Sequence, residues 1–141
     1  VEKARAFGLP VDFIEAGQPV LLHAKIGACL ATQKYGVTDP EVLEAIRCHT
    51  TGAETLSLTA RIVFLADMLE PGRKFPGVEE LRRLAREDLE QAMFTAYRDT
   101  ICYLLEAGAL IHPAAIAGYN RLALQRTNTD KLSSDDGNKK K

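Results

Sequence analysis

The sequence has almost no excess of charge of either sign. It contains 18 Lys and Arg residues against 19 Asp and Glu residues, for a net charge of -1. A nucleic-acid-binding domain usually carries a basic surface, so the composition gives no support to nucleic-acid binding. No stretch approaches the ~20 consecutive apolar residues that a membrane-spanning helix needs, so we expect no membrane segment. An anionic substrate would therefore be held by a few local lysine and arginine side chains.

Cysteine is also scarce. The three cysteines cannot all pair, no two of them have the C-x-x-C spacing, and each lies in an apolar segment; they are Cys29, Cys48 and Cys102. A disulfide framework and a zinc site built on thiolates both find no support. The pattern favours reduced, packed thiols in a cytoplasmic protein.

Several nucleotide and nucleophile motifs are absent. The sequence contains no G-x-S-x-G, no P-loop and no G-x-G-x-x-G. Serine hydrolase, P-loop NTPase and dinucleotide-binding Rossmann interpretations therefore have no support. No alternating strand pattern and no internal repeat is visible either.

What is present is helical periodicity along most of 141 residues, a length typical of one domain. The sequence therefore predicts an all-α fold. Its first eight residues resemble the end of a helix stopped by glycine, so we expect the chain to begin within a domain. Residues 1–126 would form this domain and residues 127–141 a disordered polar tail. Proline, aspartate and glycine signals place the main helices at 19–35, 40–49, 57–69, 78–86, 88–107 and 113–126.

Three metal-competent side chains lie in apolar helical segments, namely His23, His49 and Asp67. His49 shares a helix face with apolar residues, and Asp67 lies in a segment that is apolar nearly all round, so we expect both to be buried. A single histidine on such a face is more often a hydrogen-bonded core residue than a metal ligand. Three such groups together favour a nitrogen and oxygen site for iron, manganese or zinc.

Groups that suit phosphate follow two of these residues. Thr50, Thr51 and Gly52 come directly after His49, and hydroxyls with a flexible glycine suit phosphate contact as well as an ordinary helix end. Arg73 follows the Asp67 helix after two helix breakers and could fold back to bind phosphate bidentately. His112 is interpreted as structural, and the charges from Glu79 to Arg83 as a solvated helix face.

Several runs of residues together resemble the YqeK-like branch of the HD-domain metallohydrolases. The similarity covers about residues 1–125, and its most specific runs are 45–52 (Ala-Ile-Arg-Cys-His-Thr-Thr-Gly) and 64–73 (Phe-Leu-Ala-Asp-Met-Leu-Glu-Pro-Gly-Arg). The resemblance implies an all-α, HD-domain-like helical bundle. It also implies an iron-binding enzyme, with manganese or another divalent metal as alternatives, that splits diadenosine tetraphosphate symmetrically into two ADP. A homodimer is compatible with it.

The resemblance assigns roles to individual residues. His23, His49 and Asp67 take the places of the family's later metal ligands, and Asp67 would also orient the nucleophile in catalysis. The polyphosphate would lie beside a second set of residues, which comprises Thr50, Thr51, Gly52, Arg73 and Asn120. The family has two metals that lower the pKa of a bridging water, which attacks an inner phosphorus in line.

One departure from the family pattern is clear. The family has an early histidine and an adjacent His-Asp pair, whereas this sequence has three histidines and none is followed by Asp. We therefore expect an HD fold that is N-terminally incomplete, either part of a longer protein or a remnant, and poor activity from these 141 residues alone. Two alternatives stay open: an HD-type phosphohydrolase for another nucleotide, and a non-catalytic helical interaction module.

Overall fold

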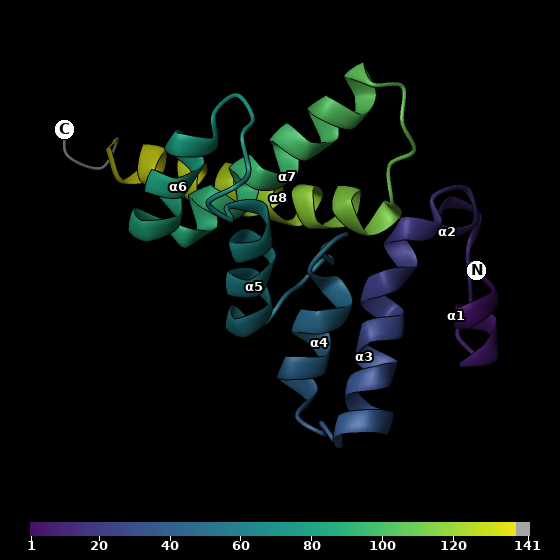
Figure 1. Cartoon of the computed structure of the whole chain (residues 1–141). Coiled ribbons are helices and arrows are strands. Elements are labelled where there is room, and N and C mark those ends of the chain that lie inside the picture. The colour runs from purple at the N-terminus through teal and green to yellow at the C-terminus, as the bar shows by residue number, and fades with distance from the viewer. Residues whose placement is uncertain (138–141) are drawn as a thin grey trace.

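The computed structural model describes residues 1–137, with side chains as far as Asn128, and this part of the chain contains helices and no strand. The all-α prediction is confirmed. The elements are α1 (Glu2–Ala6), α2 (Phe13–Gly17), the 3-10 turn η1 (Pro19–Leu21), α3 (Leu22–Tyr35), α4 (Pro40–Cys48), α5 (Leu58–Met68), α6 (Val78–Glu87), α7 (Leu89–Glu106) and α8 (Pro113–Gly137) (Figure 1). Within residues 1–137, no helix has the length and apolar character needed to cross a bilayer.

Most helices begin and end where local signals predict. Asp39 is the N-cap of α4, and its side chain accepts hydrogen bonds from the amides of Glu41 and Val42. The first residue of the helix is a proline. Asp88 caps α7 in the same way, through the amide of Gln91 at 2.9 Å. Gly36 ends α3 with a φ of 67°, a conformation that favours glycine. These boundaries are predictable because each depends on residues adjacent in sequence.

Two features differ from the prediction. The sequence pattern does not predict the short helix α2, which forms because Asp12 and Glu15 make a reciprocal capping box. Helix α8 continues to Gly137, whereas the sequence predicts a disordered tail from residue 127. The costly step in forming a helix is its first turn, whereas each residue added to an existing helix gains one hydrogen bond. A polar segment can therefore continue a helix that it could not start. The expected tail therefore has a helical backbone as far as residue 137, and residues 138–141 lie outside the described part.

The helices form two packed groups. Helices α3, α4 and α5 lie side by side in chain order, while α7 packs against α5, α6 and α8 (Figure 1). Because α3 and α4 run antiparallel, α3 begins at the edge of this layer where α4 and α5 end. His23, His49 and Asp67 occupy those helix ends, so the topology brings all three to one edge.

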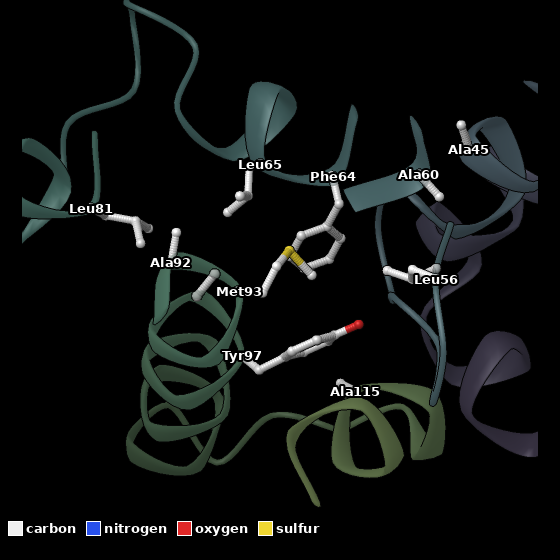
Figure 2. Packing of buried hydrophobic residues seen from close by; sticks show 11 residues of the cluster. Ala45, Leu56, Ala60, Phe64, Leu65, Leu81, Ala92, Met93, Tyr97 and Ala115 are labelled. Atoms are coloured by element: carbon white, nitrogen blue, oxygen red, sulfur yellow. The ribbon is translucent and has the colours of Figure 1, made fainter. Parts of the chain in front are cut away.

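The core lies where α5, α6, α7 and α8 meet. Tyr97 is 2% exposed, and its ring centroid lies 5.2 Å from that of Phe64 (Figure 2). The buried cluster around this pair consists of Ala45, Leu56, Ala60, Leu65, Leu81, Ala92, Met93, Ala96 and Ala115. Small residues dominate it, so the helix backbones approach closely around Phe64, Met93 and Tyr97.

Helix α5 is less buried than its sequence suggests. Its apolar character nearly all round predicts a central helix, but Leu58 is 61% and Ile62 is 52% exposed. Its buried face is made by Ala60, Phe64 and Leu65 alone. Hydrophobicity reports which residues favour burial, whereas burial itself depends on whether another element covers each face.

Candidate metal and phosphate site

The two histidines face each other across the α3–α4 pair. The Nε2 atoms of His23 and His49 are 2.9 Å apart, and the ring centroids are 4.9 Å apart. Each ring donates its Nδ1 hydrogen to a backbone carbonyl three residues earlier, His23 to Val20 at 2.5 Å and His49 to Ile46 at 2.7 Å. A carbonyl can only accept, so both Nδ1 atoms carry hydrogen, and a ring in the neutral state then presents its lone pair at Nε2.

When both rings are neutral, their Nε2 lone pairs face each other at this distance and repel, so a cation between them would relieve the contact. Backbone carbonyls that fix the Nδ1–H tautomer are the usual support for histidine metal ligands. The two Nε2 atoms are only 2.9 Å apart, so both rings could hold the same ion. This half of the donor set therefore suits a divalent transition metal.

The residues after His49 form a tight loop at this pair. The Thr50 hydroxyl lies 3.2 Å from Nε2 of His23, and Thr51 donates to the carbonyl of Gly52 at 3.3 Å. Gly52 is buried with a φ of 68°. Thr50 is thus close enough to contact a group bound at the histidines.

Tyr97 holds this loop from α7. Its hydroxyl donates to the carbonyl of Ala53 at 3.1 Å and accepts from the Ala53 amide at 3.2 Å. Burial raises the pKa of Tyr97 to about 12, although the Ala53 backbone hydrogen bond acts in the opposite direction. The hydroxyl therefore remains a donor throughout the physiological pH range. No local sequence pattern signals this hydrogen-bonding partner, because Ala53 lies 44 residues away in the chain.

Asp67 is not buried, contrary to the prediction. Its side chain is 51% exposed, because it lies at the last turn of α5 on the side of the half-exposed Val63. His23 is also exposed, and His49 is half-buried. The Asp67 carboxylate lies 3.7 Å from the guanidinium of Arg73. Arg73 thus folds back over the end of α5 and places a cation beside this acid.

The loop that carries Arg73 has its own hydrogen bonds. The Glu70 carboxylate accepts from the Gly72 amide at 2.8 Å, and the Arg73 amide donates to the Glu70 carbonyl at 2.9 Å. Arg82 of α6 donates to the carbonyls of Leu69, Glu70 and Arg73. The interpretation of Arg82 as part of a solvated face is wrong, because three backbone acceptors surround its guanidinium.

Among residues 1–128, one group of three potential ligands has its ligand atoms within 4.8 Å of one another: Asp12, Glu15 and His112. This group does not suit a cation. The Ala114 amide donates to Nδ1 of His112 at 3.1 Å, so Nε2 carries the hydrogen and points to Asp12 at 3.5 Å. The buried Glu15 carboxylate already pairs with Lys25 at 2.6 Å. The group is a structural ionic cluster, as expected for His112.

Two predicted site residues are less closely associated with the histidines. Asp67 belongs to no such three-ligand group within the part of the chain that has described side chains. Asn120 is exposed on α8, and in the same part of the chain no hydrogen bond joins it to His23, His49 or Asp67. The geometry thus joins His23, His49 and Thr50 by direct contacts and pairs Asp67 with Arg73, and both sets lie at the edge where α4 and α5 end.

Comparison with known proteins identifies the domain to which these groups belong. Residues 6–72, which include both histidines and Asp67, match the family model described as HD domain. A solved structure from Clostridium acetobutylicum, described as a predicted HD superfamily hydrolase involved in NAD metabolism, superposes with a TM-score of 0.83 at 36% identity. Residues 6–72 of this chain are therefore an HD domain. An HD domain implies a divalent metal cofactor, and the facing histidines have the chemistry to bind one.

Similar curated proteins share the name symmetrical bis(5'-nucleosyl)-tetraphosphatase. The HD-domain chain is 45% identical over 106 residues to the one from Halalkalibacterium halodurans and 39% identical over 104 residues to the one from Bacillus subtilis. These matches cover 75% and 74% of this chain but 57% and 56% of the relatives. The structural match covers 88% of this chain and 66% of the solved chain. The HD-domain chain thus spans about half the length of its curated relatives.

Proposed function

We propose that this HD-domain chain is part of a metal-dependent hydrolase that splits diadenosine tetraphosphate symmetrically into two ADP. The observation that carries the proposal is the pair of Nε2 atoms, 2.9 Å apart, of His23 and His49. Two relatives at 45% and 39% identity have names that specify this activity, which supports the choice of substrate.

Each site residue has a role in the proposal. His23 and His49 bind the metal, and Asp67 completes their set as a ligand that also orients the nucleophile. The bound metal would supply a nucleophilic hydroxide near neutral pH and neutralise developing charge on the phosphate. We propose iron, with manganese as the alternative, because imidazole and carboxylate donors suit both.

The neighbouring groups would bind the polyphosphate. The Thr50 hydroxyl is positioned to donate to a phosphate oxygen, and Thr51 and Gly52 shape the loop beside it. Arg73 offers a planar pair of donors that matches two phosphate oxygens and stabilises charge in the transition state. The exposed amide of Asn120 is proposed as a more distant contact to the same substrate. Thr50 and Arg73 thus bracket the phosphate from the α4 and α5 ends.

Metal binding is the first test. Losing a residue that only supports a metal ligand typically weakens metal affinity ~10–100-fold. Because His49 is itself a proposed ligand, we expect His49→Ala to weaken Co²⁺ affinity by more than this. His112→Ala, in the ionic cluster, is the matched control and should keep the wild-type affinity. Calorimetric titration of the purified chain measures both. Equal Co²⁺ affinity in wild type and His49→Ala would contradict the proposed metal site.

The substrate assignment needs a separate experiment. Diadenosine tetraphosphate, other dinucleoside polyphosphates and mononucleotides would be incubated with the chain and Fe²⁺ or Mn²⁺, and products separated by chromatography. The proposal expects ADP as the sole nucleotide product, whereas ATP with AMP would indicate asymmetric cleavage. Because the sequence has no adjacent His-Asp pair, we expect slow turnover. Faster hydrolysis of a mononucleotide would favour the alternative phosphohydrolase, and no metal binding would favour a helical interaction module.

Location and assembly are part of the same proposal. We propose a cytoplasmic protein, supported by the three cysteines, all of which are free thiols in the structure. We also propose a homodimer, for which the exposed Leu58 and Ile62 offer apolar surface. Sedimentation velocity at micromolar concentration tests the dimer directly.

A further inference from the structure

A second arginine organises the loop that carries Arg73. Arg82 lies on α6, and its side chain is 20% exposed. Its Nε donates to the Leu69 carbonyl at 3.2 Å, and one terminal nitrogen donates to the carbonyls of Glu70 at 2.9 Å and Arg73 at 3.2 Å. The other terminal nitrogen pairs with Glu79 at 2.5 Å. Every nitrogen of this guanidinium therefore has a protein partner.

The acceptors of Arg82 define the path of one loop. Leu69 follows α5, and Arg73 is the residue whose guanidinium returns to Asp67 at 3.7 Å. Three carbonyls directed at one cation fix the chain at both ends of this turn. A planar guanidinium can reach separate acceptors with nitrogens in a fixed arrangement, whereas a lysine ammonium offers one point of attachment.

We propose that Arg82 is a positioning residue that fixes the 69–73 loop and thereby holds Arg73 beside Asp67 for polyphosphate binding. The inference deepens the proposed function and rests on it for the role of Arg73. Arg82 itself would touch neither metal nor substrate, because its nitrogens are already bonded to the loop and to Glu79.

The next residue on the same helix provides a matched control. Arg83 is 51% exposed, and its guanidinium pairs with the carboxylates of Glu80 and Glu87 on its own helix. Arg82→Lys and Arg83→Lys both conserve charge and helix propensity. They differ in that the first alone removes a guanidinium from the loop carbonyls.

The experiment compares these two variants with wild type and Arg73→Ala. Three quantities are measured: the dissociation constant for diadenosine tetraphosphate with Co²⁺, exchange of the Gly72 and Arg73 amides, and the ¹³C shift of the Asp67 carboxyl. In Arg82→Lys we expect about tenfold weaker binding, since small misplacements of binding groups have effects of this order or larger. Both amides should exchange faster, and the Asp67 shift should move toward its value in Arg73→Ala. Arg83→Lys should match wild type in all three.

Different failures have different meanings. Wild-type binding in Arg82→Lys, or equal weakening in Arg83→Lys, would overturn the inference even if the loop exchanges faster. If wild type and Arg73→Ala bind the nucleotide equally or not at all, the proposed function fails. The ¹³C shift of the Asp67 carboxyl then tests separately whether Arg82 positions Arg73. If this shift is the same in Arg82→Lys as in wild type, the positioning role of Arg82 is overturned. Glu79→Gln keeps the Arg82 guanidinium but removes its carboxylate partner. In this variant we expect smaller changes than in Arg82→Lys in nucleotide binding, amide exchange and the Asp67 shift.

Discussion

Replacing Gly52 with alanine is expected to destabilise the protein by about 2–5 kcal/mol. A Cβ at this position would lie 2.1 Å from the Tyr97 hydroxyl and 2.5 Å from a ring carbon. The ring has little room to move, because α8 also packs closely against it: a Cβ added at Gly118 would lie 2.5 Å from the same ring. Overpacking costs about 1–3 kcal/mol, and a left-handed residue other than glycine about 1–2 kcal/mol.

Gly36→Ala separates these two contributions. Gly36 has nearly the same φ, 67° against 68° for Gly52, but a Cβ added there would have no atom within 4 Å, so only the backbone cost of about 1–2 kcal/mol applies. Urea unfolding of both variants measures the difference. Equal losses of unfolding free energy would mean that the close approach of Tyr97 to Gly52 has no energetic weight. Gly52→Ala should also weaken Co²⁺ binding, because it displaces the loop that follows His49.

The second large effect is a loss of stability at high pH that depends on Tyr97. Its folded-state pKa is raised to about 12 by burial, against about 10 in an unfolded chain. The unfolded state therefore releases this proton first, so the stabilisation is fully present below pH 10 and is lost as pH rises toward 12. A shift of this size corresponds to about 2–3 kcal/mol.

Tyr97→Phe isolates that contribution from other titrating groups. The variant keeps the ring but leaves the Ala53 amide and carbonyl without their partner, so it should be less stable than wild type at pH 8 by roughly 1–3 kcal/mol. Between pH 9 and pH 11.5 the stability gap should narrow, because wild type alone loses the Tyr97 contribution. Urea unfolding at the two pH values measures it. A constant gap across this range would mean that the Tyr97 pKa is not raised by folding.

The parts of the fold that the sequence predicts well depend on neighbouring residues. Asp39, Gly36 and Asp88 mark helix ends by bonds to amides or by conformations within a few residues. The histidine and threonine run at 49–51 is likewise recognisable as chemically unusual from its composition. In each case the physical interaction lies within a single short segment.

The rest depends on contacts between distant segments. Tyr97 donates to a carbonyl 44 residues away in the chain, and Arg82 donates to carbonyls 9–13 residues away. No periodicity in the sequence specifies such hydrogen-bonding partners. The apolar character of α5 predicts a buried Asp67, but the fold leaves that side of the helix uncovered. Sequence patterns show which residues are costly to bury, whereas the tertiary arrangement determines which of them are buried.

The separation of these contacts along the chain also suggests an order of assembly. The contact between His23 and His49 joins residues 26 apart within the α3–α4 hairpin. The hydrogen bond from the Tyr97 hydroxyl to the Ala53 carbonyl joins residues 44 apart and forms only once α7 has packed. Closing the shorter loop loses less chain entropy, and helical hairpins rich in local contacts form quickly. The two rings should therefore meet while the later helices are still docking, and a transition metal added during refolding should accelerate this early step.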